Sequence, residues 1–227
     1  MSPIDNEPRP ILPPQATTRA SFLENGVLEL PKPRLLPDVG LPDVLAARRS
    51  AVSGRVSQQQ LGDLLFHLMR ERCRGPGRFG VPWVGRASPS AGGLHVLSIL
   101  CIPVGKNDPV GVYDPSSHAL KLVQDPNPVR DANSVSVNSL CSATAGTTLQ
   151  FVADIEFLES CYENSASLLW RDSGVLAMAI SMVATSLGMT SVVLGRVGSS
   201  LLGGNNFTDR FVGAGAVHLG GGKNGSL

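Results

Sequence analysis

The most apolar stretch of the chain is Gly174-Val175-Leu176-Ala177-Met178-Ala179-Ile180-Ser181-Met182-Val183-Ala184-Thr185-Ser186-Leu187. Hydroxyl side chains alone interrupt it, and Gly188 offers a C-terminal cap for a helix. The segment is shorter than the ~20 apolar residues that cross a bilayer. A helix that is apolar on nearly all sides must be covered on most of them. We therefore expect it to form the centre of a large core or part of a subunit interface.

Two helices are expected before this segment. The first occupies residues 41–50, where Pro42 suits the first turn of a helix. The second is indicated by Ser57 and Gln60, which form a capping-box pattern ahead of leucines at helical spacing. The breaker Gly75-Pro76-Gly77 limits this helix at its C-terminal end.

Runs rich in Leu, Ile and Val predict strands, and a shorter segment predicts another helix. The expected strands are 94–104, 110–113, 120–123, 147–154, 191–194 and 211–219. Asp114-Pro115-Ser116-Ser117 is prone to form a turn and favours a hairpin between the second and third of these. The short helix is expected at 156–163. Helices and strands in this order predict an α+β domain.

The two ends of the chain differ from its centre. Residues 1–40 are rich in proline and should run as an extended arm. This arm is either a loose leader or lies, through 26–31, along the surface of the domain or of a partner subunit. A single domain is expected over 41–219, and the glycine-rich tail 220–227 should be mobile.

Composition excludes several classes of protein. The chain has 227 residues, 42% of them hydrophobic, and a net charge of +1, which suits one large domain or at most two small ones. The near-neutral charge provides no electrostatic footprint for nucleic acid. The four cysteines lack the spacing of metal ligands, so no metal is expected. The N-terminal residues lack a signal-peptide pattern, and we expect a cytoplasmic, reduced protein without a membrane span.

Arginines are concentrated in one part of the chain. Between residues 70 and 86 they are Arg70, Arg72, Arg74, Arg78 and Arg86, opposed only by Glu71. Such a cluster forms either a solvated basic face or an anion-binding loop. Composition alone does not separate these two interpretations.

Several motifs, in a fixed order, carry a resemblance to a known family. They are Leu28-Glu29-Leu30-Pro31-Lys32-Pro33-Arg34, Leu45-Ala46-Ala47-Arg48-Arg49-Ser50, Arg86-Ala87-Ser88-Pro89-Ser90-Ala91-Gly92-Gly93-Leu94-His95, Trp170-Arg171-Asp172-Ser173-Gly174 and the stretch from Ala184 to Arg196. This set resembles the nitroreductase superfamily, and within it the SagB-type (McbC-like) dehydrogenases, which include thiazoline and oxazoline oxidases. The resemblance spans roughly residues 28–219. It implies an α+β sandwich with a central, mainly antiparallel sheet flanked by helices, in an intertwined homodimer that binds FMN at the subunit interface.

The resemblance also assigns residues to the FMN phosphate. Arg48, Arg49 and Ser50 would hold the phosphate or the ribityl chain, because guanidinium groups and a hydroxyl donate hydrogen bonds to a dianion. The alternative for the two arginines is that they complement the dipole at a helix C-terminus.

Two further segments would lie near the isoalloxazine ring. By resemblance, the small residues that pass against the ring are Pro89, Ser90, Ala91, Gly92 and Gly93, although an ordinary loop has the same composition. Gly195 and Arg196 fall where related enzymes place backbone N–H groups near flavin N5 and O4. A simple corner between strand and loop is the alternative for this pair.

The chain departs from the family pattern in three places, one of which is Asp172-Ser173-Gly174-Val175 where the family has Glu-Ala-Gly-His. The usual second arginine is replaced within Ala51-Val52-Ser53-Gly54, which leaves Arg55 as a displaced substitute. Asn164 and Ser165 stand where azoline-oxidising members have a Lys-Tyr pair that serves as a base. Neither replacement can accept a proton at neutral pH, so azoline oxidation by that route is not expected.

The resemblance favours an FMN-dependent oxidoreductase that exchanges a hydride between flavin N5 and a small-molecule or peptide-derived substrate. Its acid or base is unassigned, and the candidates His95, Tyr162 and Glu163 are each also explained by structural roles. Two alternatives are a redox-inactive binding subunit of a modification complex and a general NAD(P)H-dependent nitro or quinone reductase.

Overall fold

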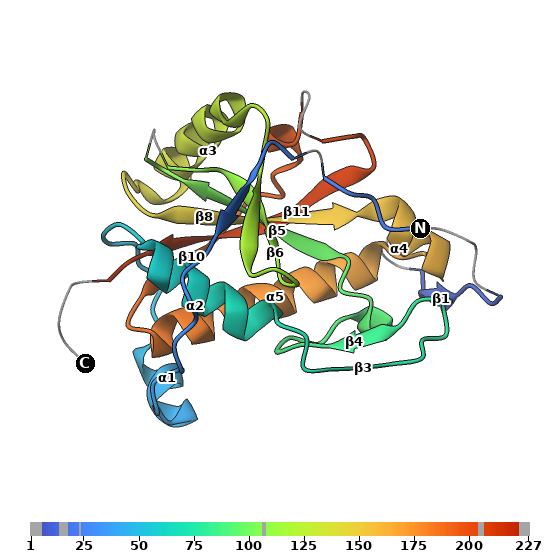
Figure 1. Cartoon of the computed structure of the whole chain (residues 1–227). Coiled ribbons are helices and arrows are strands. Elements are labelled where there is room, and N and C mark those ends of the chain that lie inside the picture. The colour runs from blue at the N-terminus through green and yellow to red at the C-terminus, as the bar shows by residue number, and fades with distance from the viewer. Residues whose placement is uncertain (1–5, 14–17, 23, 106–107, 204–206, 223–227) are drawn as a thin grey trace.

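The computed structural model of the chain describes residues 6–13, 18–22, 24–105, 108–203 and 207–222. A seven-stranded sheet forms its centre, with strand order β10-β11-β8-β5-β6-β7-β2 (Figure 1). Every pair of neighbouring strands in it is antiparallel. The strands are β2 (Val27–Glu29), β5 (Leu97–Pro103), β6 (Gly111–Asp114), β7 (Ala119–Leu122), β8 (Thr147–Asp154), β10 (Thr190–Leu194) and β11 (Phe211–Gly220). The predicted α+β class with an antiparallel central sheet is confirmed.

Helices cover both faces of this sheet. Figure 1 shows α2 (Gln58–Met69) and α5 (Ala166–Ser186) on one face and α3 (Pro126–Cys141) on the other. The short α1 (Leu41–Ala47) contacts α5, and α4 (Ile155–Cys161) directly follows β8. The sheet is therefore the middle layer of three.

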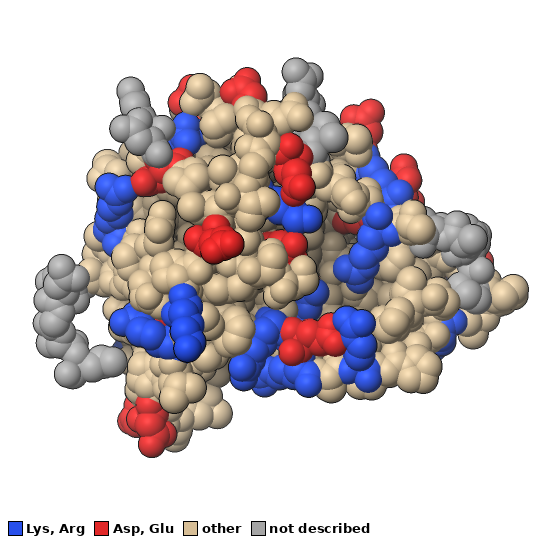
Figure 2. Space-filling model, in the orientation of Figure 1, with Lys and Arg blue, Asp and Glu red and all other residues tan. Residues whose placement is uncertain are grey.

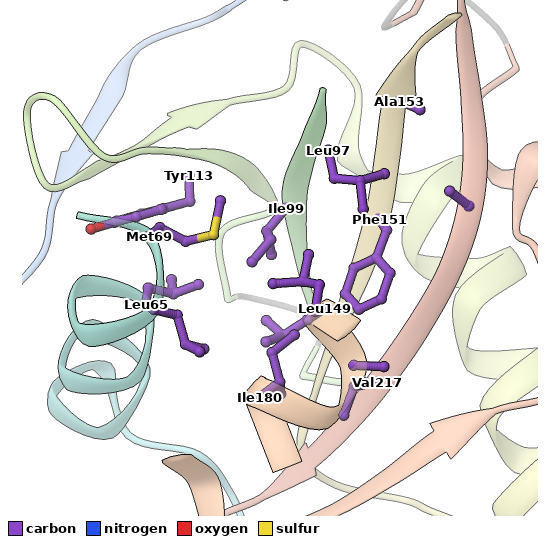
Figure 3. Close-up of a cluster of buried hydrophobic side chains, with 14 of the residues drawn as sticks. Leu65, Met69, Leu97, Ile99, Tyr113, Leu149, Phe151, Ala153, Ile180 and Val217 are labelled. Atoms are coloured by element: carbon purple, nitrogen blue, oxygen red, sulfur yellow. The ribbon is translucent and has the colours of Figure 1, made fainter. Parts of the chain in front are cut away.

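The larger core lies between the sheet and the two helices α2 and α5. Leu65 from α2, Ile180 from α5 and Val217 from β11 are fully buried there, as the close-up in Figure 3 shows. Alternation along β5 supplies both faces, because Ile99 belongs to this core and Leu100 to the smaller one beneath α3. The even burial of β5 explains why its sequence is a nearly continuous apolar run, whereas β8 is equally buried but includes the polar residues Thr147, Thr148 and Gln150.

The expected helix and hairpin signals are confirmed. Ser57 caps α2 through its side chain, and Gln60 returns the interaction to the backbone of Ser57, so the capping box is complete. β6 and β7 pair across the predicted turn. The apolar helix ends as expected, with Gly188 in the left-handed conformation at φ 69°.

The apolar helix differs from the prediction in length and in exposure. α5 starts at Ala166, eight residues before the predicted Gly174. By length and composition alone it could cross a membrane, but here it packs on α2, β10 and β11. It is not covered all round, because Trp170, Val175 and Met178 are about 40% exposed in the single chain.

Several elements are absent from the prediction, and the helix predicted at 156–163 ends at Cys161, with Tyr162–Glu163 forming the strand β9. α3 is rich in Ser, Asn and Val, which are weak helix formers, but Asp125 caps its first turn and Pro126 occupies the first position. A small hairpin of β3 (Cys73–Gly75) and β4 (Trp83–Gly85) forms in the arginine-rich segment.

The arm is docked where the structure describes it. β2 adds a strand to the sheet, so the expectation that 26–31 lies along the domain surface is confirmed. β1 (Arg9–Pro10) pairs with β9 (Tyr162–Glu163). At the other end, Gly221 and Gly222 donate backbone hydrogen bonds to the loop before α2. The rest of the predicted tail, 223–227, lies outside the described residues.

Candidate functional site

A groove of about 370 Å³ runs between α5 and the end of β10. Ser173, Gly174 and Ala177 of α5 form one wall. The opposite wall is the segment 193–197 together with 214–216 of β11. The groove therefore contains Gly195 and Arg196, which the sequence singled out, and its walls are mostly glycine, alanine and valine.

Two glycines leave open space in this groove. A Cβ atom added at Gly174 or at Gly195 meets no atom within 4 Å. Neither residue has the positive φ that requires glycine. Nothing within the single chain therefore demands a glycine at these positions, whereas a molecule lying flat in the groove would.

Arg196 lies at the end of the groove, but its guanidinium extends towards α3 on the other face of the sheet. Its Nη2 donates to Oδ1 of the buried Asn133 on α3 at 2.6 Å. Its Nε and Nη1 are buried without a partner among the described residues. Burial lowers the pKa of this guanidinium. Two buried donors of a charged group thus lack an acceptor, which is costly unless a ligand supplies one.

A buried amide shapes the segment that carries Arg196. Gln150 in β8 is fully buried and donates through Nε2 to the carbonyls of Val197 and Gly215 at 2.8 and 2.9 Å. Gly198 lies so close, at φ 86°, that a Cβ there would fall 2.2 Å from the Gln150 amide. Gln150 therefore fixes the corner that follows β10, a role that its sequence context did not indicate.

The predicted phosphate-binding residues lie at the beginning of β10. Ser50 forms a parallel bridge with Ser191, the second residue of that strand. Arg48 is half-buried, and its side chain makes no hydrogen bond within the described part of the chain. Arg49 is exposed and donates to the carbonyls of Ala46 and Arg48. Arg49 therefore interacts with the C-terminal end of its own helix, which was the alternative to phosphate binding. The side chain of Arg48 has no such interaction among the described residues.

The loop from Pro89 to Gly93 does not enter the groove. It lies against α5 through Asp172, which accepts hydrogen bonds from Ser90 Oγ at 2.6 Å and from the Ala91 N–H. The loop glycines have φ values of 60° and 65°, so the backbone conformation alone accounts for them. Within one chain, the predicted residues 48–50 lie beside the start of β10, and Gly195 and Arg196 follow its end. The predicted loop 89–93 lies elsewhere, against α5.

Arg55, the displaced substitute for the second arginine of the family, also interacts away from the groove. Arg55 forms an ion pair with Asp108. Both residues line a different, smaller pocket between β2 and α2. Ser165 is buried just before α5, and Asn164 donates to the backbone of Glu7. These two positions contribute structure and no acid or base.

The three candidate acid or base residues lie outside the groove. His95 is buried, with Nε2 2.8 Å from the carbonyl oxygen of Val84, and burial lowers its pKa to about 4. Tyr162 packs against Phe79, and burial raises its pKa. Glu163 pairs with the arm through β9. Within the single chain, each of the three residues therefore has a structural role.

Comparison with known proteins identifies the fold. No family model and no curated protein matches the sequence. Among solved structures, a protein of Ralstonia eutropha JMP134 described as a nitroreductase superposes with a TM-score of 0.65 and 19% identity, covering 94% of this chain and 100% of its own. A nitroreductase from Desulfovibrio desulfuricans in complex with FMN matches at a TM-score of 0.50 and 14% identity, covering 84% of this chain and 91% of its own.

The third comparison concerns a peptide-modifying assembly. The Escherichia coli microcin synthetase McbBCD complex with truncated pro-MccB17 bound contains a chain with a TM-score of 0.58 and 17% identity. The match covers 86% of this chain and 77% of that one. The chain therefore has the nitroreductase fold, and the resemblance that its sequence motifs indicate is confirmed at the level of the fold.

Proposed function

We propose that this chain is an FMN-dependent oxidoreductase that binds its cofactor in the groove beside α5. The observation that carries the proposal is the open space above Gly174 and Gly195, which lie on opposite walls of the groove. A planar ring needs this space, because missing side chains allow its close approach to the backbone. When bound, FMN supplies hydride exchange at N5.

The two ends of β10 provide a path for the whole cofactor. Ser191 and Gly195 are about 13 Å apart at ~3.3 Å per residue of strand. Arg48 and Ser50, beside Ser191, would hold the phosphate, while Gly195 and Arg196 would face the ring. Arg48 is the better of the two arginines for this role, because its guanidinium has no hydrogen-bond partner within the described residues.

The groove limits the chemistry that this chain supports. None of the described residues that line it carries a carboxyl, imidazole, thiol or phenol group. The chain thus orients a substrate over the ring and excludes water, but it supplies no proton acceptor there. This favours hydride exchange with a small-molecule or peptide-derived substrate that needs no base from this chain, and it disfavours azoline aromatisation by deprotonation.

We also propose that two copies of the chain form the complete site. Apolar side chains around the groove are exposed in the single chain, with Val193 at 56% and Val197 at 49%. Trp170, Val175 and Met178 of α5 continue this surface. A second copy packed on it would cover the apolar area and could bring its own 89–93 loop to the ring. The resulting homodimer would be cytoplasmic.

Flavin retention after desalting tests the proposal. The purified protein, reconstituted with FMN, should keep a flavin absorption spectrum. Gly195→Val should fold normally, because its side chain meets only open space, yet it should lose the flavin. Gly203→Val is the matched control, since Gly203 is also exposed, has open space and lacks a positive φ. Equal flavin retention in both variants would contradict the site.

A redox-inactive binding subunit is the second candidate. It is favoured by the ion pair between Arg55 and Asp108 and by the absence of a base among the described groove residues. Addition of NADH or NADPH to the flavin-loaded protein separates the candidates. Bleaching of the flavin would support a reductase, whereas unchanged absorbance with every donor and substrate would support the binding subunit.

A further inference from the structure

A second hollow, of about 330 Å³, lies where the N-terminal arm passes β6 and the end of α2. It shares none of its lining residues with the groove beside α5. Three cationic side chains line it, Arg19 from the arm, Arg86 from the loop after β4, and Lys121 from β7. In Figure 2, the main group of Lys and Arg side chains lies low on the displayed face, over the region where Figure 1 places β3 and β4, whereas the middle of the face carries both positive and negative side chains.

Arg86 differs from the other arginines of its cluster. Arg70, Arg72, Arg74 and Arg78 are exposed, as a solvated basic face requires. Arg86 is turned inward, and its Nε is buried without a partner. It makes no hydrogen bond or ion pair with any residue that the structure describes. Burial, together with the nearby positive charge of Arg19, lowers its pKa to about 10.

The arm holds Arg19 firmly in the same hollow. The N–H of Ala20 donates to Asp154 at 2.9 Å, and Phe22 stacks on Phe211 with ring centroids 4.5 Å apart. Arg19 lies over the ring of Phe157 at 4.8 Å, and Nη1 donates to the carbonyl of His95. Its side chain nevertheless stays accessible to solvent. Folding thus places two guanidinium groups near each other despite their repulsion.

Negative charge in the hollow is insufficient for three cations. Asp114 is the one carboxylate among the described lining residues, and it pairs with Lys121 at 3.6 Å. Asp154 is occupied by Arg210, which forms two hydrogen bonds with it. No carboxylate that lines the hollow pairs with Arg19 or Arg86, although Asp154 and Glu71, outside the lining, partly offset the two charges.

We propose that this hollow is a binding site for a small molecule that carries a phosphate or carboxylate group. The guanidinium groups of Arg86 and Arg19 would bind its oxyanion, since paired N–H donors match both kinds of anion. Ser98 of β5, another residue of the lining, carries a hydroxyl. Because the site shares no lining residue with the groove, the ligand is distinct from the flavin. It is either a second substrate group or an effector.

The test compares anions at constant ionic strength, which removes general screening. Inorganic phosphate and succinate are each titrated against sodium chloride while the thermal unfolding midpoint of the full chain is followed. At least one of the two should raise the midpoint, and the one that does identifies the phosphate or the carboxylate class. Chloride alone giving the same rise as both would overturn the proposal.

Arg86→Met then assigns the effect to this site. It removes an unpaired buried charge, so its midpoint without anion should equal or exceed that of the wild type. Its apparent affinity for the anion should fall at least about tenfold, the equivalent of one lost charged hydrogen bond. Arg72→Met, an exposed arginine of the same cluster, should respond like the wild type.

Two outcomes would count against the site. Arg86→Met could keep the full anion response, or it could lose bound flavin together with that response, which would make the hollow part of the cofactor site. Should Arg86→Met not fold, Arg19→Met takes its place, because Arg19 lies on the arm and is exposed. An unchanged anion response in Arg19→Met would overturn the proposal in the same way.

Discussion

Ser90 donates a hydrogen bond of 2.6 Å to the carboxylate of Asp172, and through this contact α5 holds the loop that precedes β5. The same carboxylate accepts from the Ala91 N–H, while Ser90 Oγ accepts from the N–H of His95. The one acidic side chain of α5 therefore fixes both ends of a turn. If two copies pack together through α5, the helix that forms the interface would also position this turn at the shared cofactor site.

Replacing Asp172 should loosen this loop without disturbing the core. Asp172→Ala removes three acceptor contacts, so the free energy of unfolding in urea should fall by about 2 kcal/mol, the range for hydrogen bonds to a charged group. Asp172→Asn keeps one acceptor oxygen and should lose less. Asp131→Ala, an exposed aspartate on α3, is the control and should change little. An effect of Asp172→Ala no larger than that of the control would contradict the role.

The sequence predicts the central elements because their signals are local. The capping box of α2, the turn between β6 and β7 and the glycine after α5 each define an element within a few residues. α3 is not predicted because most of its residues are polar. Its stability comes from burial of Val129 and Val137 against the sheet. Tertiary packing overrides propensity there.

The site is less visible in the sequence than the fold. Its residues come from the resemblance, which groups them by motif and does not show that Arg49 is used by its own helix or that the 89–93 loop stays outside the groove. Gln150 and Asp172 act on backbone groups that lie far away in sequence. The signal for Asp172 is that it is the one acidic residue of α5, whereas Gln150 has no local signal.

The two arginines before Ser50 should separate in function. Arg48→Met should release FMN on desalting, because its guanidinium is free for the phosphate in the described structure. Arg49→Met should keep FMN and lose about 0.5 kcal/mol of stability, since it removes a cation from the end of α1. Flavin absorbance and urea unfolding measure the two effects. Loss of FMN from Arg49→Met alone would reverse the assignment.

The exposed apolar face of α5 should be buried by a second copy. Met178→Glu places a charge in this face, where the wild-type side chain is 43% exposed, and it should convert a dimer to a monomer in analytical ultracentrifugation. Because the site would be divided between copies, the monomer should also lose FMN. Val135→Glu on α3 is the control, since Val135 is 74% exposed on the opposite layer. A monomeric wild type that retains FMN would contradict the shared site.

Because His95 is buried in its neutral form, the free energy of unfolding should decrease at acidic pH. Burial and the positive charge of Arg86 lower its pKa from 6.5 to about 4 in the folded state. The unfolded chain therefore binds a proton on this residue near pH 6.5, whereas the folded chain binds it only near pH 4. The contribution of neutral His95 to the free energy of unfolding is complete above pH 6.5 and is lost as the pH falls to 4. It amounts to about 3 kcal/mol at ~1.36 kcal/mol per pKa unit.

The variant His95→Asn isolates this contribution. Asparagine tolerates the positive φ of 47° at this position and does not titrate. Its free energy of unfolding in urea should differ less between pH 7 and pH 4.5 than that of the wild type. His218, whose pKa burial also lowers, retains part of the dependence in both proteins. The same decrease in His95→Asn as in the wild type would show that His95 is not the group that resists protonation.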